Sequence, residues 1–232
     1  FPPEIAYDSY DLRHMMSRAG AQTLVLEEGG EIRAFLLMDV DRSRKMAKEI
    51  GLTDLGSIAR LTAESDLVMS VMNPGAAVDF AREAGAAIRT QSKKPTFIDC
   101  NAVAPDTMRE IDELMKSAGA RCLDGGIIGP PPRGTAKTSL YISGPGAADL
   151  QQIGNEQLRV TIMSERLGDA SAIKACYSGF NKGTQGLLLQ TLVAAQRLGV
   201  YEQLEKQLLS SKGDLYNWLL DTLPQMPPKA YR

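Results

Sequence analysis

The order of the apolar segments restricts the fold of this chain more than any other feature. From about residue 32 to 165, short apolar runs alternate with helical patterns, and after Gly168 the pattern is helical throughout. Such alternation is typical of βαβ units and of a mostly parallel sheet with helices on its faces. The sequence therefore predicts an α/β Rossmann-like N-terminal domain over residues 1–165 and an all-helical C-terminal domain over residues 166–232.

Turn-forming residues divide the chain into individual elements. Pro74 and Pro105 each follow an apolar run and suit the first turn of a helix, where a missing N–H costs nothing. Gly29 and Gly30 are typical of a hairpin turn. The expected strands are 32–40, 66–72, 96–99, 122–128, 139–143 and 159–163, and the expected helices are 43–50, 76–87, 105–117, 171–198, 201–209 and 214–220.

Composition removes several classes of function. The 26 lysine and arginine residues nearly balance 28 aspartate and glutamate residues, and no basic block is interleaved with aromatics, so nucleic acid is not an expected partner. No apolar run reaches membrane-spanning length, and the start of the sequence does not resemble a signal peptide. Three cysteines without metal-like spacing fit a reducing environment, so we expect a cytoplasmic protein without a metal site.

The single histidine, His14, removes further mechanisms. A Ser-His-Asp triad or a Cys-His pair would have to use this residue, which lies in a charged stretch without a nucleophile motif nearby. A zinc site would also be short of ligands. Hydrolase chemistry is therefore not expected, whereas a lysine acid/base that works with a borrowed cofactor remains.

Lys174 is the candidate for that role. It lies near the start of the expected helix 171–198, which is apolar nearly all round. At about 100° per residue, four polar side chains fall within about 60° of one another: Lys174, Ser178, Asn181 and Gln185. A narrow polar stripe is expected where a buried helix lines a cavity, and burial makes a lysine available as an acid or base. The spacing is equally compatible with a lysine whose amine reaches solvent.

Three segments, in a fixed order, carry a resemblance to a known family. Residues 99–105 (DCNAVAP) match the pattern D-x-S-T-x-x-P, and residues 124–130 (DGGIIGP) match D-x-P-V-S-G-G. Gly168, Ala170 and Lys174 match G-x-G-x-x-x-K in register. The chain thus resembles the β-hydroxyacid dehydrogenase superfamily, which contains 6-phosphogluconate dehydrogenase and 3-hydroxyisobutyrate dehydrogenase, and within it the phosphogluconate-dehydrogenase-like NAD-binding branch with its helical C-terminal domain.

The resemblance, which covers about residues 55–232, implies roles for individual residues. Lys174 would shuttle the substrate hydroxyl proton while hydride passes between the substrate and a nicotinamide. Tyr177 and Ser178 replace the paired asparagines of the family, so Ser178 and Asn181, on the face of Lys174, would serve as donors. Imine reductases of the superfamily lack this lysine, which favours alcohol or ketone chemistry here. The resemblance also implies substrate binding by Ile128, Gly129 and Pro130, and cofactor binding by Asn101. Met72, Asn73 and Pro74 come at the end of the expected strand 66–72, and we expect them to bind the cofactor because ligands of open α/β sheets bind beyond the carboxyl ends of the strands.

The nucleotide-binding end departs from the family. Relatives open with a strand and a G-x-G-x-x-G loop, and neither this first strand nor its glycine loop is evident here. Relatives also continue into further helix, so the chain looks clipped at both ends; the alternative is a divergent protein that has lost its cofactor cradle.

Two segments are candidates for the strand end that reads the cofactor ribose. Residues 38–43 are favoured by their distance from the expected strand 66–72, and residues 4–8 are the alternative. In the favoured segment, Arg42 and Ser43 would hold the 2′-phosphate of NADP, whereas Asp39 or Asp41 would prefer the free 2′-hydroxyl of NAD. Residues 41–43 are also compatible with a solvated helix cap.

These observations predict an NAD(P)-dependent oxidoreductase that transfers hydride between NADP or NAD and a small hydroxy acid or related carbonyl compound. The alternative is a non-catalytic dimeric binding or scaffold protein that retains the fold. The apolar length of helix 171–198 exceeds what the short helical domain could cover alone. We therefore expect a homodimer, with residues 166–232 serving both substrate binding and dimerisation.

Overall fold

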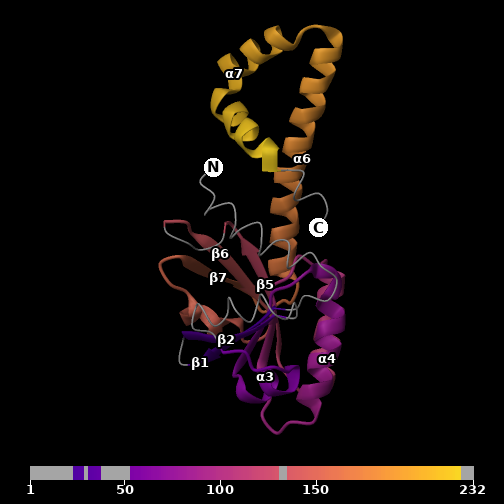
Figure 1. The fold of residues 1–232 in the computed structure, drawn as a ribbon, viewed down its shortest axis with the longest axis vertical. Coiled ribbons are helices and arrows are strands. Elements are labelled where there is room, and N and C mark those ends of the chain that lie inside the picture. The colour runs from indigo at the N-terminus through magenta and orange to yellow at the C-terminus, as the bar shows by residue number, and fades with distance from the viewer. Residues whose placement is uncertain (1–22, 29–30, 38–52, 131–134, 226–232) are drawn as a thin grey trace. The chain divides into compact units, whose positions relative to one another are not determined.

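The computed structural model describes residues 23–28, 31–37, 53–130 and 135–225 (Figure 1). Contacts divide the chain into two compact units, residues 1–174 and residues 175–232. The first unit holds a sheet with flanking helices and the second is helical, so the predicted fold class is confirmed. The predicted division of roles between residues 1–165 and 166–232 stays a prediction.

Seven strands of the described residues form one sheet in the order β2-β1-β3-β4-β5-β6-β7 (Figure 1). The pairs β3–β4, β4–β5 and β6–β7 are parallel, and the pairs β1–β2, β1–β3 and β5–β6 are antiparallel. The carboxyl ends of β3, β4 and β5 therefore lie at the same edge of the sheet. The strands are β1 (Thr23–Glu28), β2 (Glu31–Leu37), β3 (Leu67–Ser70), β4 (Thr96–Asp99), β5 (Cys122–Ile128), β6 (Thr138–Ser143) and β7 (Leu158–Ser164).

The edge formed by β1 and β2 differs from the prediction. The sequence placed a strand at 32–40 within a βαβ unit, but β2 pairs antiparallel with β1, which was not predicted. Glu28 lies opposite Glu31, so two residues separate the paired strands, as the predicted hairpin turn requires. A connection of that length joins antiparallel strands, because a parallel pair needs a crossover of a dozen or more residues. The predicted helix 43–50 lies outside the described residues.

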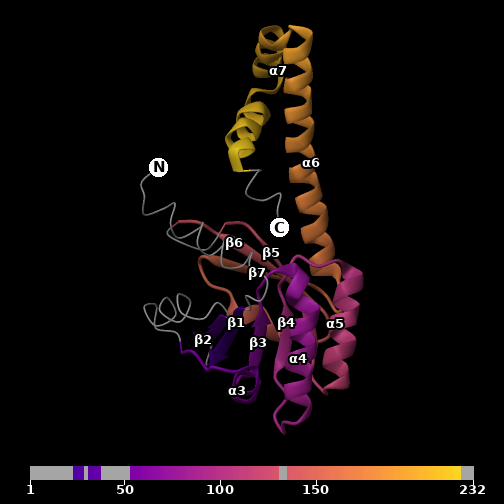
Figure 2. The ribbon, with the colours of Figure 1, turned by 45° about the vertical axis from the view of Figure 1, so that its right-hand side comes forward.

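Three helices of the first unit pack beside one another, and Figure 2 shows α4 and α5 side by side. Both carry an acidic residue in the first turn and a basic residue in the last, as the helix dipole favours. Two 3-10 helices, η1 and η2, complete the unit. The elements are α3 (Ile58–Glu64), η1 (Pro74–Ala76), α4 (Ala77–Arg89), α5 (Pro105–Ser117) and η2 (Ala147–Ile153).

Neighbouring residues of β3 and β4 enter two separate cores, because successive side chains of a strand point to opposite faces. Val68 and Phe97 pack in the core formed with α3, α4 and α5, where the rings of Phe97 and Phe80 stack with centroids 5.8 Å apart. Leu67 and Ile98 enter the second core, which includes buried residues of β6 and η2. The central strands are thus covered on both faces, which explains their uninterrupted apolar sequence.

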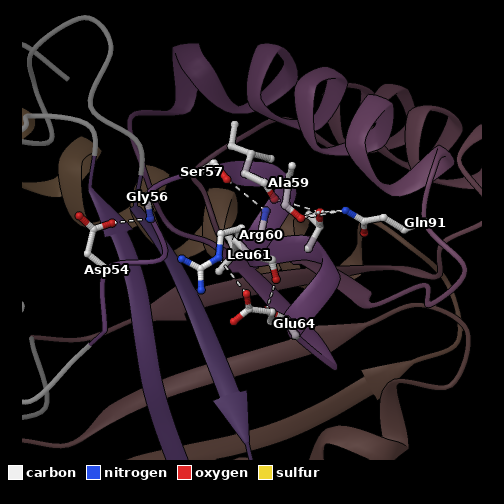
Figure 3. Close-up of polar contacts among 11 residues, drawn as sticks. Asp54, Gly56, Ser57, Ala59, Arg60, Leu61, Glu64 and Gln91 are labelled. Carbon is white, nitrogen blue, oxygen red and sulfur yellow. Dashed lines mark hydrogen bonds and ion pairs between the residues drawn. The ribbon is translucent and has the colours of Figure 1, made fainter.

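The short helix α3 was not predicted. The Ser57 hydroxyl caps its start by accepting the Arg60 N–H at 3.2 Å, and Arg60 pairs with Glu64 at 2.9 Å (Figure 3). Gln91 follows α4 by two residues, and its Nε2 donates to the Ala59 carbonyl of α3 at 2.8 Å, which connects the two helices (Figure 3). Seven residues are too few to show a helical period, so pattern analysis does not detect such a helix.

The second unit contains most of α6 (Asp169–Leu198), together with α7 (Tyr201–Thr222) and the short η3 (Leu223–Gln225). The helices predicted at 201–209 and 214–220 form the single α7, which is interrupted at Lys212 by non-helical backbone angles (φ −143°, ψ 27°). Leu188 of α6 packs with Tyr216 and Leu219 of α7 in a small separate core.

The expectation that α6 is buried on all sides is wrong for a single chain. Phe180 is 65% exposed and Leu187 is 69% exposed, whereas Gln185 on the polar stripe is only 9% exposed. The reason is that α7 and the small core around Leu188 cover only part of the helix circumference.

Candidate active site

A buried network joins the carboxyl ends of β3 and β4. The Asn101 amide donates to Ser70 Oγ at 2.8 Å and to Asp99 Oδ2 at 2.7 Å, and its oxygen accepts the Met72 N–H. Asp99 Oδ1 also accepts the Asn101 backbone N–H at 3.0 Å. Burial raises the pKa of Asp99 to about 6, although the hydrogen bonds from Asn101 act in the opposite direction.

This network brings together the predicted cofactor-binding residues of the two loops. Met72 and Asn101 are joined directly, and Asn73 caps η1 by accepting the Gly75 N–H at 3.0 Å. Pro74 is the first residue of η1. Since the donors and the acceptor of the Asn101 amide are already engaged, its side chain fixes the loop and leaves contact with a ligand to other atoms.

The N-terminus of α6 is anchored on β5 and β6. Asp124 Oδ2 accepts the Ser171 N–H at 2.8 Å, and Asp124 Oδ1 accepts the Ser171 hydroxyl at 2.5 Å. Ser143 Oγ donates to the same carboxylate at 3.2 Å and accepts the Ala170 N–H at 3.0 Å. Because the first N–H groups of a helix have no partner within it, these two strand residues act as its cap. Burial raises the pKa of Asp124, against these hydrogen bonds.

Gly126 permits the close approach of β5 to this first turn. A Cβ at Gly126 would lie 2.5 Å from the Ala170 carbonyl oxygen and 3.6 Å from Lys174 Cβ. Only a residue without a side chain fits between the strand and the helix here.

The half-buried Lys174 lies at the carboxyl end of β4, where Nζ donates to the Cys100 carbonyl at 3.2 Å. Burial lowers the pKa of Lys174, and nearby negative charges, with Asp99 and Asp124 among them, oppose this effect. The Cys100 thiol is itself buried, which raises its pKa and keeps it uncharged near neutral pH. Within the described part of the chain no carboxylate forms an ion pair with Lys174. Asp169, near it on the same helix, pairs with Arg166 instead.

The predicted substrate loop follows β5. Ile128 ends this strand and lies two residues after Gly126, so its side chain points to the face on which α6 begins. Gly129 has φ +125°, and a Cβ there would lie 3.1 Å from the Lys137 carbonyl oxygen, so the turn requires glycine. The Thr138 hydroxyl donates to the Pro130 carbonyl and fixes the next residue.

The other predicted residues are placed less directly. Ser178 and Asn181 are half-buried and follow Lys174 on α6 by about one and two turns, within the second unit. Asp41, Arg42 and Ser43 lie outside the described residues.

Sequence reasoning missed three residues of the site: Ser70, Ser143 and Ser171. Each is a buried hydroxyl whose partner is 19 to 47 residues away, so no local pattern identifies it. The available signal was a polar residue at the end of an apolar strand or in the first turn of a helix.

No group of three or more histidine, cysteine, aspartate or glutamate side chains within the described ranges is arranged to hold a metal ion. None of the helices that the structure describes combines the length and the apolar character needed to cross a membrane.

Two curated proteins are similar to this chain over much of its length. One is an uncharacterized 28.5 kDa protein in 7S RNA 5′ region from Methanothermus fervidus, 26% identical over 173 residues, which are 75% of this chain and 65% of that protein. The other is the 3-hydroxyisobutyrate dehydrogenase of Pseudomonas aeruginosa, 27% identical over 194 residues, which are 77% of this chain and 63% of that protein. The chain thus spans less than two thirds of either relative.

Solved structures share the fold. The 3-hydroxyisobutyrate dehydrogenase of Mycobacterium tuberculosis with L-serine has a TM-score of 0.62 at 20% identity, over 75% of this chain and 61% of that chain. An imine reductase from Myxococcus stipitatus in complex with NADP+ has a TM-score of 0.59 at 19% identity, over 82% of this chain and 68% of that chain.

A family model shows the relationship most directly. The model of the NAD binding domain of 6-phosphogluconate dehydrogenase matches residues 16–153, which is more than half of the 232 residues. The resemblance inferred from three sequence motifs is thereby confirmed. This chain belongs to the 6-phosphogluconate dehydrogenase NAD-binding family.

Proposed function

We propose that this protein is an NAD(P)-dependent oxidoreductase that acts on a small hydroxy acid or the related carbonyl compound. The observation that carries the proposal is the placement of Lys174. The residue is half-buried, and its amine lies against the Cys100 carbonyl at the carboxyl end of a parallel strand and forms no ion pair within the described residues. Ligands of open α/β sheets bind at this edge, and a lysine of lowered pKa suits proton transfer there.

The described residues fit one part of a nicotinamide cofactor. The loops after β3 and β4 meet at the carboxyl edge, and Asn101 fixes them through Met72. We assign Met72, Asn73 and Pro74 to this binding surface, with Asn101 as the residue that holds its shape. Asp41, Arg42 and Ser43, outside the described residues, are proposed to read the ribose. When bound, a nicotinamide cofactor supplies hydride exchange with the substrate carbon.

Lys174 is proposed to carry the proton of the reaction. Its neutral amine accepts the proton of a substrate hydroxyl, and its ammonium returns a proton to a carbonyl oxygen in the reverse direction. Ser178 and Asn181 are proposed as donors to the substrate. Ile128, Gly129 and Pro130 are proposed to enclose it from the end of β5.

The substrate class follows from the same lysine. Oxidation of an alcohol requires a group that removes the hydroxyl proton, and we assign this step to Lys174. The similarity to the 3-hydroxyisobutyrate dehydrogenase of Pseudomonas aeruginosa supports a small hydroxy acid, whereas the two solved structures, at 20% and 19% identity, share the fold alone.

Fluorescence titration of the protein with NADH and NADPH tests the first step of this proposal. We expect saturable binding with a preference for one cofactor. A panel of small 3-hydroxy acids should then give a substrate-dependent change in the absorbance band of the reduced nicotinamide. Binding without turnover on hydroxy acids, together with turnover on imines, would contradict the substrate class.

A second candidate is a dimeric binding or scaffold protein that retains the fold without catalysis. It is supported by the antiparallel β1 beside β3, at a place where the βαβ pattern led us to expect a parallel strand. Among the described residues, no strand leads through a glycine-rich loop into a helix. Absence of binding by both cofactors at millimolar concentration would favour this candidate over the oxidoreductase.

A further inference from the structure

Asp124 is a buried carboxylate whose described hydrogen bonds all lead to the place where α6 begins. The residue is 0% exposed and lies in β5. Leu123 precedes it, and Gly125 and Gly126 separate it from Ile127. Ionised carboxylates are almost never fully buried unless they are paired or hydrogen-bonded. Here three hydrogen bonds reach it, two from Ser171 and one from Ser143.

These bonds fix the helix less than one turn before Lys174. Ser171 precedes Lys174 by three residues, and Ser143 holds the neighbouring Ala170 N–H. Gly126, two residues after Asp124 on the same strand, lies so close to Ala170 that a Cβ there would be 2.5 Å from the Ala170 carbonyl oxygen. Any displacement of this first turn is therefore transmitted to the amine, which contacts Cys100 at the end of the adjacent strand.

The charged groups around Lys174 come from three elements. β4 contributes Asp99, whose carboxylate is held by Asn101, and the loop after it contributes Cys100, whose buried thiol is uncharged near neutral pH. β5 contributes Asp124. On α6 itself, Asp169 is paired with Arg166 and bound by Ser164. Among the described groups, Asp124 is the one that supplies negative charge and also holds the helix.

We propose that Asp124 is a positioning residue for Lys174: its carboxylate clamps the first turn of α6 onto the sheet and provides part of the negative charge that the amine faces. The proposal rests on the function proposed above, in which Lys174 carries the proton. Asp124 does not contact substrate or cofactor in this scheme. It acts through the position and the protonation of the lysine.

The titration of Lys174 tests this directly and needs no substrate. Protein labelled with ¹³C-lysine gives one Cε resonance per lysine, and Lys174→Arg assigns the relevant signal. Asp124→Asn keeps an oxygen for the Ser171 N–H but removes the charge. We expect the titration midpoint of Lys174 to fall, because loss of a nearby opposite charge disfavours the ammonium form. An unchanged midpoint would overturn the proposal.

Asp66→Asn is the matched control, because Asp66 is a 75% exposed carboxylate that precedes β3, at the opposite edge of the sheet. It should leave the Lys174 midpoint unchanged. Ser171→Ala removes one hydrogen bond and keeps the carboxylate, so it serves if Asp124→Asn does not fold. In Ser171→Ala the chemical shift of the Lys174 ¹³Cε resonance and its titration midpoint should both change, because Asp124 holds the first turn of α6 less firmly. An unaltered resonance would count against this role of Asp124.

Two further readouts separate this proposal from a purely structural role and from failure of the proposed function. With any hydroxy acid that the protein oxidises, the rising limb of the kcat–pH profile should move to lower pH in Asp124→Asn by the same amount as the amine midpoint. A uniform loss of rate without movement of the limb would refute the positioning role. Lack of NADH and NADPH binding, with the Lys174 shift present, would refute the oxidoreductase and leave the clamp standing.

Discussion

Replacement of Gly126 by alanine tests how tightly the strand and the helix must approach. The added Cβ would lie 2.5 Å from the Ala170 carbonyl oxygen and 3.2 Å from its carbonyl carbon, where ordinary contacts begin at 3.4 Å. Gly126 has no left-handed φ, so the effect is steric and not conformational. Both contact atoms are backbone, so the helix start must move by about 1 Å, and overpacking of this kind costs about 1–3 kcal/mol.

Urea unfolding measures this cost as a lower midpoint at unchanged slope. Gly183→Ala is the control, because Gly183 lies on α6 and a Cβ there would meet nothing within 4 Å. An alanine in a helix interior is favoured over glycine by about 0.5–1 kcal/mol, so this variant should be slightly more stable. The two substitutions, one on the strand that approaches α6 and one on α6 itself, should therefore change stability in opposite directions.

The same displacement should disturb Lys174. A misplacement of about 1 Å can cost about 10²-fold in rate, so Gly126→Ala should lower kcat far more than it lowers cofactor affinity. Wild-type stability in Gly126→Ala, or a Lys174 ¹³Cε resonance identical to that of the wild type, would show that the strand and helix do not approach as described.

Three other variants and one measurement of size extend these tests. Lys174→Met should lower kcat by about 10²–10⁴-fold with unchanged cofactor affinity and melting temperature, and full activity would remove the residue from the mechanism. The pKa of Asp99 is about 6 in the folded chain against an ordinary 3.8, so between these values the folded chain retains a proton that the unfolded chain releases. The free energy of unfolding should therefore fall by about 3 kcal/mol as the pH rises from about 4 to 6. Urea unfolding at each pH should show this fall in the wild type and not in Asp99→Asn. Arg42→Ala should weaken NADP binding far more than NAD binding, and equal losses by calorimetry would assign Arg42 a structural role. Light scattering at micromolar concentration should give a dimer, since Phe180 and Leu187 are 65% and 69% exposed in one chain, and a monomer would contradict this.

Much of the sheet was predictable because its central strands are buried on both faces. The expected strands 96–99 and 122–128 coincide with β4 and β5, and helix 105–117 coincides with α5. The strands contain short apolar runs, α5 has a clear helical period, and a proline marks the start of this helix. For the β1–β2 hairpin, the turn and the strand at 32–40 were predicted, but β1 and the antiparallel pairing were not, because an apolar run does not reveal whether its neighbour is parallel or antiparallel.

The candidate site was predictable at its lysine and less so at the groups that hold it. Lys174 is a charged residue in an apolar helix, which is visible in the sequence. The capping role of Asp124 depends on the pairing of β5 with β6, which places Asp124 opposite Ser143. Similarly, Ser70 reaches the Asn101 network only because it pairs with Asp99 in the parallel register of β3 and β4. The register of the strands depends on packing between residues far apart in the sequence, so local sequence patterns do not predict it.

The sequence distances between hydrogen-bonded residues of the site have a consequence for folding. Lys174 and Cys100 are 74 residues apart, Ser171 and Asp124 are 47 apart, and Asn101 and Met72 are 29 apart. Contacts of this separation close large loops of chain, and their entropic cost must be met before they stabilise anything. The amine therefore reaches its place only after β3, β4, β5 and β6 have assembled and the helix has docked. The site proposed for proton transfer is therefore expected to form late in folding.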